Sequence, residues 1–169
     1  DAEVVAVTLG PAGAVAAARR ALQMGAARGV HVLDDRAAGS DVVATARILA
    51  AAARHVGADG GAAGEGPTGS GVGYAGPAGL GDVGLVVTGM ASMDGMTSLL
   101  PAALAAVLGV PALTNATDVT LSGGELTVRR DVLCADEVFA APLPAVLSVT
   151  DEANSPRDPN MKALLAAKK

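Results

Sequence analysis

The sequence predicts an α/β fold with a doubly wound, mostly parallel sheet and antiparallel strands added near its C-terminal end. Apolar runs such as Val4–Leu9 and Val83–Val87 lack polar alternation, which is typical of strands buried on both faces of a parallel sheet. Alanine-rich, helix-like segments separate these runs. Farther on, Gly123-Gly124 between two short apolar-polar segments predicts a β-hairpin.

In the first two thirds of the chain, predicted strands and helices alternate. Gly25 ends the first helix, because glycine is the usual residue just past a helix C-terminus. Ser40 or Asp41 caps the second helix through a side-chain oxygen. The predicted elements are a strand at Val4–Leu9, a helix at 12–25, a strand at Val30–Leu33, a helix from 41 to about 55, a strand at Val83–Val87, a helix at Leu99–Leu108 and a strand at Ala112–Thr117.

The pattern changes after this last strand. The hairpin joins Val119–Leu121 to Leu126–Val128, and two more strands follow. These strands, Glu137–Ala140 and Ala145–Val149, are predicted as an antiparallel addition to the parallel core. A proline-punctuated stretch comes next, and it is expected to be exposed and extended because proline lacks the N–H that a strand ladder needs.

This reading divides the chain into an α/β domain over residues 1–150 and a C-terminal segment with an arm helix over 151–169. The domain carries an unusual stretch at residues 57–81, where eleven of twenty-five residues are glycine. Such a segment buries too little apolar area to offset its ordering entropy. We therefore expect a disordered surface insertion there, and a phosphate-binding role is the weaker alternative because no strand directly precedes these glycines.

Composition limits the classes of function. The chain has 169 residues, a net charge of −5 and one residue each of Tyr, Phe and Cys. A negative charge disfavours nucleic acid as a partner. The mean hydropathy is +0.44, but prolines and glycines interrupt the longest apolar stretch, so no membrane insertion is expected. A single cysteine and an acidic start without an apolar run favour a cytoplasmic location, and we expect that a first strand of the domain precedes residue 1.

No set of residues predicts a metal site or a catalytic centre. His31 and His55 stand alone, without the converging ligands that a metal requires. Two acidic pairs, Asp34-Asp35 and Asp151-Glu152, are the other candidates. Neighbouring residues on an extended chain point to opposite faces, so these acids are better interpreted as solvated loop ends. Cys134 is interpreted as a small strand residue.

The most promising site follows the strand that ends at Thr88-Gly89. Ser98 is the predicted N-cap of the next helix, which places Pro101 in the first turn, where its missing donor costs little. The free backbone donors of Leu99 and Leu100 then make an anion site at the carboxyl edge of the sheet. The alternative to an anion site is a purely structural role, in which Asp94 and Thr97 form only a turn and a helix cap.

The C-terminal tail and four other ordered motifs resemble the beta subunit of the electron transfer flavoproteins. The tail, Pro142–Lys169, contains Asn154-Ser155-Pro156-Arg157 and ends in Ala-Lys-Lys. The other motifs are the strand and Gly-Pro turn Val4–Pro11, the helix end Arg20–Ala26, the helix start Gly39–Asp41 and the loop Thr88–Gly95. The resemblance implies an adenine-nucleotide-binding, Rossmann-like fold. It also implies AMP in this subunit and FAD held mainly by an alpha subunit, so that the chain is an electron carrier component and not an enzyme in its own right.

The resemblance carries over to two sets of residues. The cofactor-binding set is Leu9, Ser92, Asp94, Gly95, Thr97, Ser98, Leu99 and Leu100. The set that docks a donor dehydrogenase, such as an acyl-CoA dehydrogenase, is Asp151, Glu152, Ala153, Asn154, Pro156 and Arg157. Met96, Leu99 and Pro101 replace polar residues common in the family. This difference disfavours a dinucleotide as the ligand of the loop and favours AMP. Ala153 stands where the family has an exposed Leu or Ile.

Two other functions remain open at this point. A stand-alone adenine-nucleotide-binding domain of the stress-protein type has a similar sheet, but it has no reason to carry the Asn154–Arg157 motif. A scaffolding subunit that kept the fold and lost redox docking would explain the Gly-rich stretch and the altered anchor positions. A yellow complex on co-purification with a partner separates the carrier from both.

Overall fold

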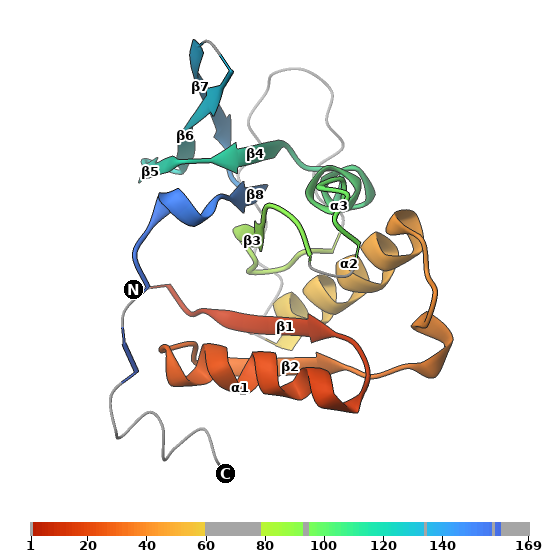
Figure 1. Ribbon diagram of the computed structural model, residues 1–169. Helices are drawn as coiled ribbons and strands as arrows, with labels where there is room; N and C mark the ends of the chain where they lie inside the picture. The colour runs from red at the N-terminus through yellow and green to blue at the C-terminus, as the bar shows by residue number, and fades with distance from the viewer. Residues whose placement is uncertain (1, 60–78, 93–94, 134, 157, 160–169) are drawn as a thin grey trace. The chain divides into compact units, whose positions relative to one another are not determined.

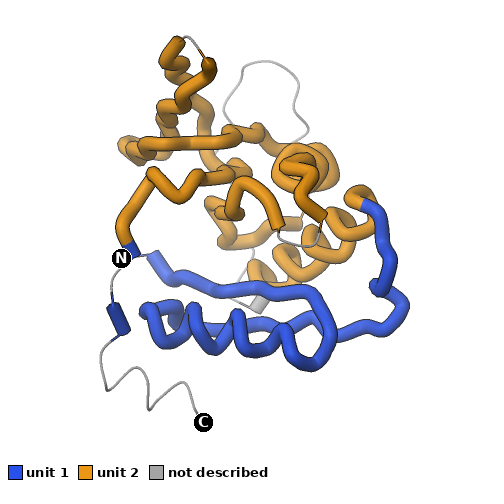
Figure 2. Tube along the Cα trace, in the orientation of Figure 1, with its two compact units in different colours: residues 1–41, 156–169 blue, residues 42–155 orange. Residues whose placement is uncertain are grey.

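A computed structural model describes residues 2–59, 79–92, 95–133, 135–156 and 158–159 of this chain (Figure 1). The chain divides into two compact units, residues 1–41 with 156–169 and residues 42–155 (Figure 2). Each unit has its own parallel strands and helices, and each is described separately below. The predicted arm helix falls on residues 160–169 and lies outside the described residues.

The first unit is a β-α-β motif. Strands β1 (Val5–Leu9) and β2 (Arg28–Val32) pair in parallel, and α1 (Val15–Gln23) connects them. A Cβ built on Gly29 would lie 3.5 Å from the side chains of Ala18 and Leu22, so a small residue in β2 allows α1 to lie close to the strand. Short 3₁₀ turns, Ala12–Ala14 and Asp35–Ala37, follow the two strands.

The second unit contains a parallel sheet in the order β3-β8-β4 and an antiparallel sheet in the order β5-β6-β7. Its helices are α2 (Val42–Asp59) and α3 (Leu100–Leu108). The strands of the parallel sheet are β3 (Leu85–Gly89), β4 (Ala112–Ala116) and β8 (Ala145–Val149). Those of the antiparallel sheet are β5 (Asp118–Ser122), β6 (Glu125–Val132) and β7 (Ala135–Pro142). Parallel sheets with covering helices and an antiparallel addition confirm the predicted α/β fold class.

The prediction for Ala145–Val149 was wrong in one respect. This segment is not part of the antiparallel addition but is β8, the central strand of the parallel sheet, paired with β3 on one side and β4 on the other. Four of its five residues are buried, as expected for a strand covered on both faces. Strand order in a sheet depends on long-range pairing, which the local pattern does not specify.

Two apolar clusters hold this unit together. In the first, small side chains of α2 (Ala46, Ala50 and Ala53) allow α3 to approach closely, so that Leu104 and Leu108 pack beside Val146 of the central strand. In the second, residues of the parallel sheet pack against one face of the antiparallel sheet. The parallel sheet contributes Leu113, Ala116, Ala145 and Leu147, and β6 contributes Leu126 and Val128. The core is therefore built from Ala, Val and Leu, as the near absence of aromatic residues indicates.

The expectation of a structureless segment over 57–81 is wrong at both ends. Residues 57–59 belong to α2, and Leu80 is only 2% exposed within the first apolar cluster. Gly57 packs so closely that a Cβ there would lie 1.9 Å from the carbonyl oxygen of Leu80. Leu80, near the end of the glycine-rich stretch, therefore packs in the core. Residues 60–78, which make up the rest of the segment, lie outside the described residues.

The predicted hairpin is confirmed. Strands β5 and β6 pair in antiparallel register around Gly123 and Gly124, whose φ angles are 59° and 84°. Two consecutive left-handed residues are the requirement of the common two-residue hairpin turn, which glycine meets without strain. The other strand and helix boundaries shift by a few residues; β3, for example, begins at Leu85 and ends at Gly89.

Candidate functional site

The loop between β3 and α3 carries most of the predicted cofactor-binding residues. It begins at Gly89, the last residue of β3, and the helix starts at Leu100. The described members of the predicted set in this loop are exposed at Ser92, Gly95, Thr97, Ser98 and Leu99 and half-buried at Leu100. Asp94 lies outside the described residues. The loop leaves the carboxyl end of a parallel strand, which is where ligands bind in open α/β sheets.

The helix start differs from the prediction. The N-cap of α3 is Leu99, not Ser98, and no side chain caps the helix there. Ser98 has a φ of 52°, a left-handed conformation that removes it from the extended geometry of an N-cap serine. Instead, the backbone N–H of Leu99 donates to Thr97 Oγ1 at 3.5 Å. Pro101 lies in the first turn, as predicted.

The backbone of this loop is tightly turned. The Met96 N–H donates to the Ser92 carbonyl at 3.0 Å, and Met96 has a φ of 48°. Ser98 is left-handed and Leu99 right-handed, so two successive residues take the paired conformations of an anion-binding nest. The nest lies directly before the positive end of α3, where the first-turn N–H groups have no partner within the helix.

Leu9 is half-buried at the end of β1, in the other compact unit. The turn that follows it is well held: the Gly10 N–H donates to the Val32 carbonyl at 3.2 Å, and His31 Nε2 lies 3.0 Å from the Gly10 carbonyl oxygen. His31 therefore contacts the backbone of this turn. Because Leu9 and the β3–α3 loop belong to different units, the place of Leu9 in one site with this loop remains a prediction.

The predicted docking segment begins directly after β8. Asp151–Ala153 form a 3₁₀ turn, η3, and the backbone is extended only from Asn154 onward. The expectation of an extended segment is therefore wrong for Asp151–Ala153, because the Ala153 N–H closes a turn on the Thr150 carbonyl at 3.3 Å, and it holds for Asn154. Asp151, Glu152, Asn154 and Pro156 are exposed and Ala153 is half-buried, while Arg157 lies outside the described residues.

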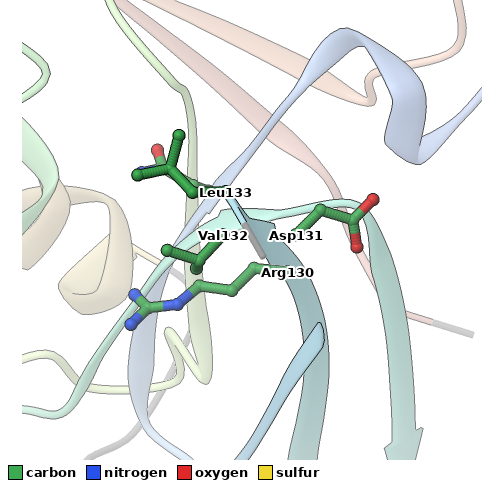
Figure 3. Close-up of a pocket in the computed structure, with 5 residues that line it drawn as sticks. Arg130, Asp131, Val132 and Leu133 are labelled. Atoms are coloured by element: carbon green, nitrogen blue, oxygen red, sulfur yellow. The ribbon is translucent and has the colours of Figure 1, made fainter. Parts of the chain in front are cut away.

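One hollow in the second unit was not predicted. Its volume is about 470 Å³, and Figure 3 shows side chains at the β6 end that line it; the lining residues are Asn115, Arg130, Asp131, Val132 and Leu133. Arg130 is held by Glu137 at 2.6 Å and lies 4.5 Å from the centre of the Phe139 ring. Since its charge is already paired with Glu137 of β7, this arginine serves the packing of β6 against β7. In the sequence, Arg130 lies between Arg129 and Asp131, just past the predicted strand Leu126–Val128, and nothing there indicated a hollow.

The acidic pairs fall in turns. Asp34 begins a 3₁₀ turn: its carboxylate accepts from the Arg36 N–H at 3.0 Å and pairs with the Arg36 guanidinium at 2.7 Å. The hydrogen bond from the Arg36 side chain, with that from its backbone, lowers the pKa of Asp34 to about 2. Within the described ranges, no three His, Cys, Asp or Glu side chains converge as a metal site would require. None of the described helices combines the length and apolar character needed to cross a membrane.

Comparison with known proteins agrees with this fold. A family model described as "Electron transfer flavoprotein domain" matches residues 1–75 and 77–169. The chain is 36% identical over 169 residues to "Electron transfer flavoprotein subunit beta" of Mycobacterium tuberculosis, covering 100% of this chain and 54% of that protein. It is 34% identical over 167 residues to the protein of the same name from Syntrophomonas wolfei, covering 99% of this chain and 56% of the relative.

A plant relative is also similar. "Electron transfer flavoprotein subunit beta, mitochondrial" of Oryza sativa is 32% identical over 168 residues, covering 98% of this chain and 56% of that protein. The chain thus spans about half the length of the curated relatives that it matches. The match runs through both compact units and includes the β3–α3 loop and the segment after β8. This chain belongs to the electron transfer flavoprotein beta-subunit family.

Proposed function

We propose that this chain acts within the beta subunit of a heterodimeric electron transfer flavoprotein. In that role it helps to shuttle electrons from dehydrogenases, such as acyl-CoA dehydrogenases, through FAD held mainly by the alpha subunit. The chain itself is then a carrier component and not a self-sufficient catalyst. Family membership supports this role, and the β3–α3 loop is the structural observation that carries it.

The β3–α3 loop fits the phosphate of AMP. The left- and right-handed pair Ser98-Leu99 has the backbone conformations of an anion-binding nest, and the positive end of α3 follows at once. The exposed hydroxyls of Thr97 and Ser98 are available to add hydrogen bonds to the same anion. Ser92 holds the turn in which Gly95 lies. We propose that Asp94 and Leu9 complete the site toward the sugar and the base.

The chain is poorly suited to hold a flavin ring alone. Of its two aromatic residues, Phe139 is engaged by the Arg130 guanidinium at 4.5 Å, and Tyr74 lies outside the described residues. A flavin ring needs a broad apolar or aromatic surface to lie against. FAD held chiefly by an alpha subunit is consistent with this composition, and the bound FAD would supply the electron-carrying chemistry.

The segment after β8 fits a docking role. Asp151, Glu152, Asn154 and Pro156 are exposed, so several consecutive side chains are accessible to another protein. Redox partners use small, weak interfaces, for which a short exposed segment is sufficient. We propose that residues 151–157 dock the donor dehydrogenase. We further propose a cytoplasmic location; "mitochondrial" is part of the name of the rice relative only.

Co-expression with an alpha subunit of the same family tests this function. The expected result is a yellow complex with FAD that a dehydrogenase reduces, whereas the chain alone carries no stoichiometric flavin. Nucleotide binding by the isolated chain, without complex formation, would favour the stand-alone domain instead. A stable yellow complex that no dehydrogenase of the usual type reduces would favour a scaffolding subunit.

A further inference from the structure

We propose that Thr150 is a positioning residue for the docking segment, acting by fastening the base of that segment to the end of β4. This inference rests on the proposed docking role of residues 151–157. Thr150 is half-buried between β8 and η3, and its hydroxyl bonds the Ala116 carbonyl without capping the turn. It would therefore act through the backbone that it holds, and not by touching the dehydrogenase.

Thr150 places both of its donors on one acceptor. Its backbone N–H donates to the Ala116 carbonyl at 3.0 Å, and its hydroxyl donates to the same oxygen at 3.4 Å. The hydroxyl does not cap η3, although Thr150 occupies the N-cap position of that turn. The Thr150 carbonyl in turn accepts the N–H of Ala153, the residue at the centre of the docking segment. A continuous chain of hydrogen bonds therefore runs from β4 through Thr150 to Ala153.

The acceptor is brought into place by a bulge in β4. Leu113 of β4 pairs with Leu147 of β8, and Ala116 pairs with Val149. Between these two pairs, β4 advances by three residues and β8 by only two. One extra residue in β4 thus moves the Ala116 carbonyl back to face Thr150. The bulge is held by Ser148, whose wholly buried hydroxyl accepts from the Asn115 N–H at 2.9 Å.

The acceptor end of this linkage is rigid. Ala116 is 0% exposed and belongs to the second apolar cluster, so its carbonyl cannot shift without disturbing the core. On its other side, η3 contacts β5, the edge strand of the antiparallel sheet (Figure 1). The docking turn is therefore fixed at two places before a partner arrives. A segment fixed in advance loses less conformational entropy on binding, which favours affinity.

The test compares Thr150 with a second threonine that has the same bonding pattern. Thr117 also places its N–H and its hydroxyl on one carbonyl oxygen, that of Arg129, at 2.8 and 3.1 Å. Both of its bonds go to β6 of the hairpin, and neither is made to a residue of the docking segment. Thr→Val keeps the side-chain shape and the N–H and removes only the hydroxyl. Thr117→Val is therefore the matched control for Thr150→Val in the co-expressed complex.

We expect Thr150→Val to raise the apparent KM of the complex for its dehydrogenase about three- to tenfold, the effect of one lost hydrogen bond. The kcat at saturation and the flavin content should not change. Thr150→Ser restores the hydroxyl and should return the KM to the original value, whereas Thr117→Val should leave the KM unaltered. Amide hydrogen exchange at Ala153 should become faster in Thr150→Val alone.

Two outcomes would overturn the proposal. One is an unchanged KM in Thr150→Val, and in Thr150→Ala if the valine variant does not fold. The other is an equal rise in Thr150→Val and Thr117→Val, which would indicate a general loss of stability. Deleting residues 151–157 separates this failure from that of the docking role. If the deletion raises the KM and Thr150→Val does not, only the positioning is wrong; if the deletion has no effect, both are wrong.

Discussion

The backbone N–H of Asn115 lies 2.9 Å from the hydroxyl of Ser148, a serine that is 0% exposed in the middle of the parallel sheet. Asn115 has a φ of 59°, so the chain turns into the left-handed region at this point of β4. Asparagine tolerates that region better than most residues. The buried hydroxyl satisfies the amide that the bulge withdraws from the strand ladder. Ser148, a polar residue in the otherwise apolar strand β8, thereby stabilises the irregular strand β4.

Ser148→Ala should destabilise the protein by about 1–3 kcal/mol, because it leaves the part-buried Asn115 N–H without its acceptor. Urea denaturation of the chain measures the change. Ser122→Ala is the matched control, since Ser122 is exposed at the end of β5 and its loss should change the free energy of unfolding by less than about 0.5 kcal/mol. Equal effects of the two substitutions would show that the Ser148 hydroxyl does not hold the bulge.

The Asp34–Arg36 pair predicts a pH-dependent contribution to stability. The Arg36 side chain, and then its N–H, lower the pKa of Asp34 from 3.8 to about 2. A depressed carboxylate pKa stabilises the folded state above pH 3.8, and this stabilisation is lost as the pH falls from 3.8 to about 2. Both groups are exposed to solvent, so salt should weaken the effect.

Arg36→Gln should therefore return the pKa of Asp34 toward 3.8. NMR titration of the Asp34 carboxyl carbon measures this value directly. Arg20→Gln is a suitable control because Arg20 pairs with Gln23 on α1 and not with an acid. If the Asp34 titration is the same in the Arg36→Gln and Arg20→Gln variants, the ion pair does not exist in solution.

Gly57 and Leu80 hold the two ends of the glycine-rich segment together. Gly57→Ala places a Cβ 1.9 Å from the Leu80 carbonyl oxygen, a backbone atom that cannot move aside cheaply. We expect a loss of about 1–3 kcal/mol, the usual cost of overpacking. Gly13→Ala has no atom within 4 Å and should be neutral or stabilising. Thermal unfolding compares them, and a harmless Gly57→Ala would mean that this contact is loose.

The sequence predicted those parts of the fold that depend on local pattern. The Gly123-Gly124 hairpin followed from turn chemistry, and β1 followed from an unbroken apolar run. The central position of β8 was missed because strand order depends on contacts between distant segments. Leu80 was missed because composition was averaged over a glycine-rich window, although one leucine was enough to reach the core.

In the candidate site, too, features that depend on local pattern were predicted and others were missed. The loop after β3, with Pro101 in the first turn of α3, was predicted from local rules. Ser98 was assigned as the cap because serine favours that position, but its left-handed backbone excludes it. A capping rule based on residue type does not take the backbone conformation of the residue into account. The bulge at Asn115 is tertiary in origin.

The nucleotide site predicts a specific chemical result. Denaturing the co-expressed complex and chromatographing the supernatant should release AMP rather than NAD. Gly95→Val should empty the site, because Gly95 is exposed in the turn and its ideal Cβ would already lie 3.3 Å from Ser92 Oγ. Gly84→Val, before the start of β3 and away from the loop, would meet the Leu143 side chain at an ordinary 3.8 Å and is the control. A well-folded complex without any nucleotide would leave the loop with a structural role only.

The docking segment predicts a gain of affinity by substitution. Ala153 offers roughly 2 kcal/mol less apolar burial than the Leu or Ile that the family carries here, or about thirtyfold in affinity. Ala153 is half-buried at the end of a turn whose other two residues, Asp151 and Glu152, are exposed. Ala153→Leu should therefore lower the apparent KM of the complex for a dehydrogenase of the usual type and leave the flavin content unchanged. Ala153→Ser, similar in size to alanine, is the control for a mere change of residue. If Ala153→Leu changes nothing and deletion of residues 151–157 leaves electron transfer intact, another surface docks the dehydrogenase.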